Sequence, residues 1–255
     1  MGVTDKFPDV SVIASFDRRR PATLVHTSDC HLDKADGGPE QLAFQAVIDL
    51  AIDRQADVLL IAGDLFDHNR VKEEIVVWVA SQLNRFPGPV VLLVGNHDSL
   101  HDASVHRRHD LRDICERLIM LDHPDGKSLD LPGSDITVWG RAMVEHSPEF
   151  WPLANAPTGR ADRWSVIAAH GLVEAEEGRS SPMTTKEIAA LSADYVALGH
   201  VHVHTIVHES PPTRYSGATH VRWTDTSGCV VVDFVPGEGA SVEWVCLEKY
   251  LSAGR

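Results

Sequence analysis

Five apolar segments of this chain each end abruptly in a short polar group, and this recurrence limits the possible folds more than any other feature. The clearest case is the apolar run 90–94, which is followed by Gly95, Asn96, His97 and Asp98. A short apolar run that stops at a glycine and then at polar side chains is typical of a buried parallel strand that ends at a ligand-binding edge. We therefore expect an α/β fold with a largely parallel sheet, in which these polar groups meet.

Four other apolar runs end in the same way. They cover residues 23–28, 58–62, 166–169 and 195–198, and they are followed by Asp29-Cys30-His31, Gly63-Asp64, His170-Gly171 and Gly199-His200-Val201-His202. Alternate side chains of an extended segment point to the same side, so Asp29 and His31 can bind one ion, and so can His200 and His202. Together the five strand ends predict a shared metal site.

The candidate ligands are carboxylates, imidazoles and one amide: Asp29, His31, Asp64, Asn96, His170, His200 and His202. This mixture without thiolates suits divalent ions such as Mn²⁺, Fe²⁺ or Zn²⁺, and of these we expect Mn²⁺. Seven ligands exceed the need of one tetrahedral ion, so we predict two ions that share a bridging carboxylate. Two metals roughly 3.5–4 Å apart are a known arrangement for in-line displacement at phosphorus.

The spacing of apolar residues predicts helices over 41–54, 72–84, 103–117 and 184–191, the first of which alternate with strands as βαβαβα. After His202 the pattern changes to short strand runs at 205–209, 214–216, 229–234 and 241–247, which favours antiparallel pairing. We divide the chain into a leader, residues 1–22, and one domain, residues 23–255.

The charge balance argues against strong binding of duplex nucleic acid. The chain has 23 Lys and Arg residues against 37 Asp and Glu residues, a net charge of −14, whereas non-specific binding of nucleic acid depends on basic contacts. We find no signal-peptide pattern, no apolar run near the roughly 18 residues of a membrane span, and no paired motif among the four cysteines. We therefore expect a cytoplasmic protein with reduced thiols and no membrane contact.

The five polar groups, in this order, closely resemble the motifs of the calcineurin-like metallophosphoesterase superfamily over residues 24–202. The resemblance implies a four-layer α/β/β/α sandwich, in which two mixed sheets are flanked by helices. It implies one metal ion held by Asp29, His31, Asp64 and His202, and a second held by Asp64, Asn96, His170 and His200. It further implies that His97 protonates the leaving oxygen and that Asp98 orients His97.

Within this superfamily the segments 27–32, 61–67 and 215–218 are similar to those of SbcD-type DNA-repair nucleases. In Ser/Thr protein phosphatases an Arg-Gly pair follows the bridging aspartate, but here His68-Asn69 stands in its place, which disfavours phosphoprotein substrates. The chain ends at Arg255 directly after its β-rich part, so we expect it to lack the DNA-capping domain of that branch. The resemblance also raises an SMC-like ATPase as a partner.

We therefore predict a dinuclear-metal phosphoesterase that hydrolyses phosphodiester bonds, with substrates such as single-stranded DNA or nucleotides. The alternatives are a phosphomonoesterase or cyclic-nucleotide phosphodiesterase on the same site, and a non-catalytic scaffold. Asp67 and His68 lie in the loop after Asp64 and could meet the substrate. The histidines outside the motifs, His146 among them, are assigned to the core or the surface.

Overall fold

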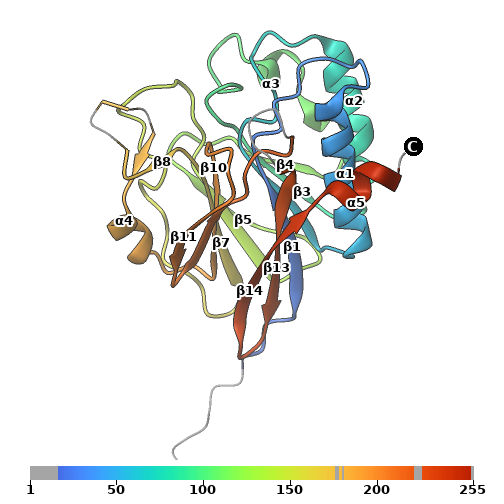
Figure 1. Cartoon of the computed structure of the whole chain (residues 1–255). Helices are drawn as coiled ribbons and strands as arrows, with labels where there is room; N and C mark the ends of the chain where they lie inside the picture. Colours follow the sequence, from blue (N-terminus) through green and yellow to red (C-terminus); the bar gives the residue numbers. More distant parts are fainter. Residues whose placement is uncertain (1–16, 176–177, 180, 221–225, 254–255) are drawn as a thin grey trace, which may run out of the picture.

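Two six-stranded mixed sheets, packed face to face, form the centre of the molecule (Figure 1). The computed structural model describes residues 17–175, 178–179, 181–220 and 226–253, so most of the predicted leader, residues 1–16, lies outside the described residues. The first sheet has the order β14-β13-β1-β2-β3-β4 and the second β11-β12-β10-β7-β6-β5. A small two-stranded sheet joins β8 to β9.

The strands of the first sheet are β1 (Ala22–Thr27), β2 (Val58–Ala62), β3 (Val90–Leu93), β4 (Leu118–Leu121), β13 (Gly228–Val235) and β14 (Gly239–Cys246). Those of the second are β5 (Lys127–Asp130), β6 (Ile136–Gly140), β7 (Trp164–His170), β10 (Tyr195–Gly199), β11 (Thr205–Glu209) and β12 (Pro212–Tyr215). The small sheet consists of β8 (Leu172–Val173) and β9 (Pro182–Met183).

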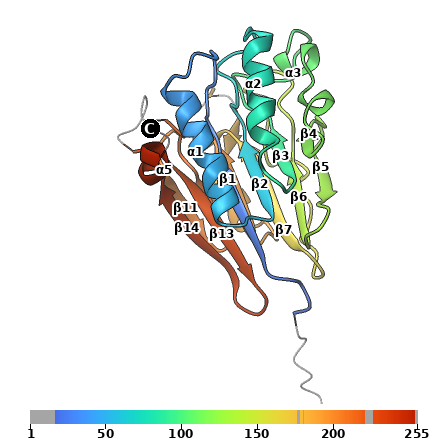
Figure 2. The same cartoon turned by 90° about the vertical axis from the view of Figure 1, so that its right-hand side faces the viewer.

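Helices cover the outer faces of both sheets. Figure 2 shows α1 (Pro39–Asp53) and α2 (Glu73–Leu83) side by side over the first sheet, where α5 (Glu248–Ala253) also lies. The second sheet is covered more sparsely, by α4 (Thr185–Ala189) and by the long connection between β6 and β7 (Figure 1). Among the described residues no helix is long and apolar enough to cross a membrane.

Strand β2 explains why these layers form, because it is apolar at every position. Leu59 and Ile61 belong to the core between the first sheet and its helices, whereas Val58 and Leu60 belong to the core between the two sheets. A strand that is buried on both faces reads as a continuous apolar run. A third core, which includes Trp139, lies on the outer face of the second sheet. The predicted four-layer α/β/β/α arrangement is therefore confirmed.

The sheets are parallel where the motifs lie and antiparallel at their edges. Strands β1 to β4 pair in parallel, and so do β6, β7 and β10. The predicted antiparallel pairing of the later strands is found between β11 and β12 and between β13 and β14. Strand β12 also pairs with β10 in parallel, which was not predicted. The parallel arrangement brings the carboxyl ends of β1, β2, β3, β7 and β10 to one edge.

The predicted helix over 103–117 is wrong. The structure has a short helix, α3 (Val105–Arg108), and a 3-10 turn, η1 (Leu111–Asp113), followed directly by β4. The helix stops at His109, whose φ of −138° and ψ of 81° leave the helical region. The Asp110 side chain then accepts a hydrogen bond from Arg112 N and starts the new turn. Local capping by a short polar side chain therefore overrides the apolar spacing of this segment.

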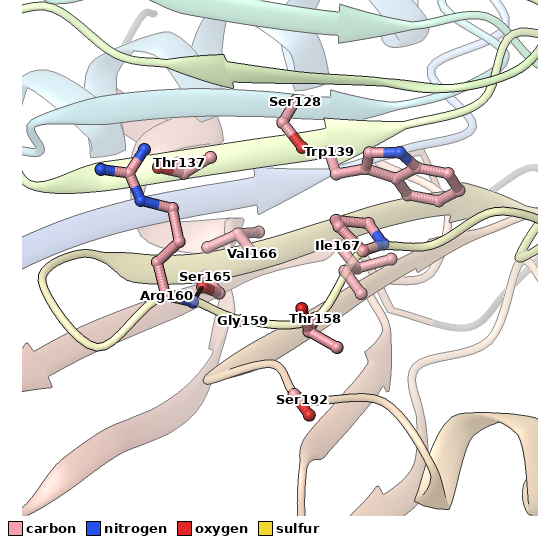
Figure 3. Close-up of a pocket in the computed structure, with 11 residues that line it drawn as sticks. Ser128, Thr137, Trp139, Thr158, Gly159, Arg160, Ser165, Val166, Ile167 and Ser192 are labelled. Atoms are coloured by element: carbon pink, nitrogen blue, oxygen red, sulfur yellow. Dashed lines mark hydrogen bonds between the residues drawn. The ribbon is translucent and has the colours of Figure 1, made fainter.

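A small cavity of about 90 Å³ lies on the outer face of the second sheet, between β6, β7 and the loop at 157–160 (Figure 3). Thr137 and Trp139 of β6 line it, and Arg160 flanks it from the loop. The Arg160 guanidinium is already paired with Asp130 and Asp162. Among the described residues that line this cavity there is no candidate metal ligand, so the functional site is sought at the strand ends.

Candidate metal centre

Four of the candidate ligands have backbone angles in the left-handed region. The value of φ is 53° at Asp29, 47° at His31, 52° at Asp64 and 102° at His200. Such angles cost a non-glycine residue about 1–3 kcal/mol each and are held only where the surroundings fix them. At the end of β1, for example, His31 N donates a hydrogen bond of 3.1 Å to the carbonyl of Asp64. Strained backbone at four ligand positions points to a site in which side-chain direction matters.

One group of donor atoms combines Asp29 and His31, after β1, with His202, after β10. The Nε2 atoms of His31 and His202 lie 3.1 Å apart. Asp29 Oδ1 lies 4.0 Å from His31 Nε2 and 3.7 Å from His202 Nε2. Two imidazole nitrogens at this distance, with a carboxylate oxygen beside them, form a set that one divalent cation would satisfy.

A second group combines Asp64, after β2, with His170 at the end of β7 and His200 after β10. Asn96 joins it, because its Oδ1 lies 3.1 Å from His170 Nε2 and 2.9 Å from His200 Nδ1. His170 Nδ1 donates a 2.9 Å hydrogen bond to the carbonyl of Ala62, which directs Nε2 toward the other donors. Metal-binding histidines commonly use their second nitrogen in this way.

Asp64 lies between the two groups. Its Oδ2 is 3.3 Å from His170 Nε2 and 4.0 Å from His31 Nε2, while its Oδ1 accepts a 2.9 Å hydrogen bond from His97 N. A Cβ atom at Gly95 would lie 2.1 Å from Asp64 Oδ1, so a glycine is required there. Burial raises the pKa of Asp64, but His170, His31 and His97 outweigh burial and hold that pKa below its usual value. The carboxylate therefore stays ionised, as a bridging ligand must.

His97 lies beside the two groups, with its ring held by Asp67. His97 Nδ1 donates a 2.6 Å hydrogen bond to the carbonyl of Asp67, and the side chain is 43% exposed. Asp67 Oδ1 lies 3.1 Å from His31 Nδ1, so the same residue also supports a candidate ligand. Asp67, His31 and His97 together form a third group of donor atoms. The sequence suggests only that Asp67 could meet the substrate, because nothing in its local sequence indicates either contact.

Asp98 has different partners from the one that we expected. Its side chain is fully buried. Oδ1 accepts a hydrogen bond from Gly95 N at 2.8 Å, and Oδ2 accepts from Leu65 N at 3.0 Å and Phe66 N at 3.2 Å. His106 Nε2 lies 3.2 Å from the same Oδ2. Asp98 thus ties the loop after β2 to the loop after β3, whereas the ring of His97 is held by another residue.

The end of β12 and the residue that follows it support two of the strand ends that carry candidate ligands. The hydroxyl of Tyr215 donates a 2.8 Å hydrogen bond to the carbonyl of Gly171, next to a ligand of the second group. Ser216 Oγ lies 2.8 Å from Ser28 Oγ, which in turn donates to Asp29 Oδ2. In the sequence this segment stands out only through its resemblance to the nuclease branch. In the structure its contacts help to position the strand ends that carry Asp29 and His170.

An open cleft of about 690 Å³ adjoins Asn96 and His97. The described residues that line it are His68, Asn69, Arg70, Asn96, His97, Ser99, His101, Ala103, Glu145 and His146. His146, which the sequence assigns to the core or the surface, lines this cleft. Burial lowers the pKa of His146, and the charges of Asp64, His97 and His170 act on it as well. It comes from the long connection after β6, where sequence spacing gives no indication of the site.

Two facing mixed sheets, whose strand ends present imidazole, carboxylate and amide donors to one another, define the class of the protein as an α/β/β/α sandwich with a candidate metal centre. More particularly, the chain belongs to the calcineurin-like phosphoesterases, because the model of that family matches residues 22–204. That family is one of phosphoester hydrolases, and the imidazole, carboxylate and amide donors at the strand ends agree with this membership.

Individual relatives are distant. The chain is 25% identical over 248 residues to an uncharacterized metallophosphoesterase of Bacillus subtilis, YhaO. The matched region covers 85% of this chain and 58% of that relative. It is 31% identical over 137 residues to the DNA double-strand break repair protein Mre11 of Methanosarcina acetivorans, covering 50% of this chain and 21% of that one. The chain thus spans less than two thirds of the length of either relative.

The fold is also found among solved structures. A crystal structure of a protein of Thermus thermophilus superposes with a TM-score of 0.57 and 14% sequence identity, covering 90% of this chain and 100% of the other. At this level of identity the similarity concerns the fold alone, and it agrees with the two-sheet arrangement described above.

Proposed function

We propose that this chain is a phosphodiesterase that uses two divalent metal ions, with Mn²⁺ as the expected ion. The observation that carries the proposal is the position of Asp64 between two converging donor groups, beside an open cleft. The donor chemistry fits such ions, because every group offers imidazole nitrogen and carboxylate oxygen without thiolate. The 3.1 Å separation of the Nε2 atoms of His31 and His202 supports the fit, since a shared cation would satisfy both lone pairs.

The residues that would hold the ions form two sets, Asp29, His31, Asp64 and His202 for one, and Asp64, Asn96, His170 and His200 for the other. When bound, such ions supply positive charge for the phosphoryl oxygens and lower the pKa of an attacking water. The chain contributes the direction of the donors, which the Ala62 carbonyl fixes for His170 and the left-handed backbone fixes for Asp29 and His31.

His97 is our candidate for the general acid. Its Nδ1 proton is committed to the carbonyl of Asp67, which leaves Nε2 free to give a proton to the departing oxygen when the ring is protonated. The ring is close to the donor groups and 43% exposed, so both substrate and solvent can reach it. A non-catalytic scaffold would have no use for an imidazole held in this way, which disfavours that alternative.

The shape of the surface next to the site favours a diester over a monoester. A second hollow, of about 570 Å³, adjoins the cleft, and His68 and Arg70 line both. Phosphorus in a diester carries two substituents, and two adjoining hollows give room to both, whereas a monoester needs only one. The similarity of half the chain to a protein named for DNA double-strand break repair is consistent with a nucleic-acid diester.

The direct test measures metal content and substrate class on one preparation. The chain, freed of metal and reloaded with Mn²⁺, should hold two ions by elemental analysis and should hydrolyse bis-p-nitrophenyl phosphate faster than p-nitrophenyl phosphate. Fe²⁺, Zn²⁺ and Mg²⁺ are compared in the same way to identify the preferred ion. Faster turnover of the monoester would contradict the diester assignment and favour the phosphomonoesterase alternative. Full metal loading with no turnover of either ester would favour the scaffold.

Two further expectations stay predictions. A cytoplasmic location and an SMC-like ATPase partner both follow from the resemblance and from the sequence. Affinity purification of the tagged chain from its own host, followed by mass spectrometry, would test the partner. A purification that recovers no such ATPase at endogenous expression would contradict it.

A further inference from the structure

The 690 Å³ cleft beside the candidate metal centre is unusual for so acidic a chain, because imidazole and guanidinium groups dominate its lining. Four imidazoles and one guanidinium line the 690 Å³ cleft: His68, His97, His101, His146 and Arg70. Among the described residues, its lining includes one carboxylate, that of Glu145. The whole chain, by comparison, has a net charge of −14. The donors therefore gather where an anionic substrate would have to enter.

Arg70 differs from most arginines of the described chain, which are held by partners. A carboxylate pairs with Arg19, Arg20, Arg54, Arg85, Arg112, Arg160, Arg163 and Arg214. Backbone carbonyls accept hydrogen bonds from Arg107, Arg108 and Arg141. The exposed Arg70 guanidinium has no such partner among the described residues, although its neighbour Asn69 is buried and anchored on both sides. A guanidinium group without a partner, on a backbone that its neighbour holds in place, is well suited to bind an anion.

Arg70 lines both hollows. It lines the cleft beside Asn96 and His97, and it also lines the 570 Å³ hollow together with Lys34 and Lys72. These two lysines are also exposed, and no ion pair holds either of them among the described residues. A guanidinium offers a planar fork of donors that matches two oxygens of one phosphate.

We propose that Arg70, assisted by Lys34 and Lys72, binds a second phosphate of the substrate, next to the one that is hydrolysed. The substrate class is then a strand with at least two phosphates in succession, as in a short single-stranded nucleic acid. This inference rests on the proposed diesterase function and adds to it a requirement for substrate length. Three carboxylates also line the second hollow: Asp33, which lies 3.2 Å from His68 Nε2, Asp36, which accepts a hydrogen bond from Gly38 N, and Glu74. The second phosphate is therefore assigned to the side of the hollow formed by Arg70, Lys34 and Lys72.

The experiment compares two substrates that differ only in the second phosphate. Thymidine 5′-(p-nitrophenyl phosphate) has one phosphate, and its 3′-phosphorylated form has two, while the scissile bond and the leaving group are the same. The Mn²⁺-loaded chain should show a kcat/KM about tenfold higher for the 3′-phosphorylated substrate. In Arg70→Gln that ratio should fall toward one, and Lys34→Gln with Lys72→Gln should lower it in part.

Arg117→Gln is the matched control, because Arg117 is also exposed and its guanidinium has no ion pair among the described residues. It lies directly before β4, at the opposite edge of the sheet. This control should keep the full ratio. A wild-type ratio near one, or an equal loss on both substrates in Arg70→Gln, would overturn the inference. Hydrolysis of bis-p-nitrophenyl phosphate separates this failure from failure of the diesterase proposal, since that substrate has no second phosphate.

Binding gives an independent readout. Fluorescence anisotropy of a labelled phosphorothioate trithymidylate should show weaker affinity in Arg70→Gln than in Arg117→Gln. The slope of log affinity against log salt should fall by about 0.7, the value for one phosphate contact on a single strand. An unchanged affinity and salt slope in Arg70→Gln would overturn the proposal even if no ester were turned over.

Discussion

Replacing Asp98 by asparagine distinguishes two possible roles of Asp98. It either joins the loops after β2 and β3, or it orients the ring of His97. The carboxylate accepts hydrogen bonds from Gly95 N, Leu65 N and Phe66 N, and His106 Nε2 lies 3.2 Å from Oδ2. An asparagine has one acceptor oxygen. If that oxygen takes the Oδ2 position, its amide group faces Gly95 N, so one buried donor loses its partner and the other bonds lose their charge.

The size of the effect follows from these bonds. A hydrogen bond to a charged group contributes about 1.5–3 kcal/mol, a neutral one about 0.5–1.5 kcal/mol, and a buried donor without a partner costs about 1–3 kcal/mol. Relief from burying a charge offsets part of the loss. We therefore expect Asp98→Asn to lower the free energy of unfolding by about 3 kcal/mol. With an m-value near 3 kcal/mol/M, the urea midpoint would fall by about 1 M.

The assay is urea unfolding of the metal-free chain, together with calorimetric titration of Mn²⁺. Because Asp98 joins the loop of Asp64 to the loop of Asn96, the variant should also bind Mn²⁺ about tenfold more weakly. Asp102→Asn serves as the control, since Asp102 is exposed and should change neither quantity. An unchanged urea midpoint and Mn²⁺ affinity, with a selective loss of rate for poor leaving groups, would refute this reasoning and restore the orienting role.

Four more predictions concern the same centre. Asp64→Asn should lose both ions, or one with severe weakening of the other, by elemental analysis; full occupancy of both sites would remove the bridging assignment. His97→Ala should keep its metals and lose rate most for poor leaving groups, and an equal loss for nitrophenolate and alkoxide esters would indicate that His97 only positions the phosphate. Gly95→Ala places a Cβ 2.1 Å from Asp64 Oδ1, so Mn²⁺ affinity should fall at least tenfold by titration calorimetry; wild-type affinity would contradict the close approach. Removal of the metal ions by a chelator should lower the melting temperature of the chain. Ions at 1,000 times their dissociation constant stabilise the folded state by about 4 kcal/mol per site. A melting temperature that does not change with chelator would argue against ions that bind only the folded chain.

Candidate ligand positions could be predicted from the sequence because each lies at the end of a largely buried strand. In β3, a run of apolar residues and a glycine leave little choice about where the chain turns, and parallel pairing then brings Asn96 to the same edge as Asp64. These positions follow from local chemistry and from one topological rule, and they require no knowledge of distant contacts.

Residues whose role depends on another part of the chain could not be predicted from local chemistry and that rule. Asp98 follows His97 directly, and adjacency suggested a contact, but beyond the end of the strand side chains no longer alternate regularly. Two of its partners, Leu65 N and Phe66 N, lie more than 30 residues away. His146 lines the cleft from a long irregular connection, and no spacing rule predicts where such a segment lies.

The two proposed ligand sets each take residues from both sheets, and this makes the chain suitable as a split reporter. Ligands from the first sheet all precede residue 97, and those from the second all follow residue 169. A cut at the exposed turn of Pro132 and Gly133, between β5 and β6, would leave each fragment with an incomplete ligand set. Because β13 of the second fragment must pair with β1 of the first, fusing the fragments to two interacting proteins would make ester hydrolysis a signal of their association.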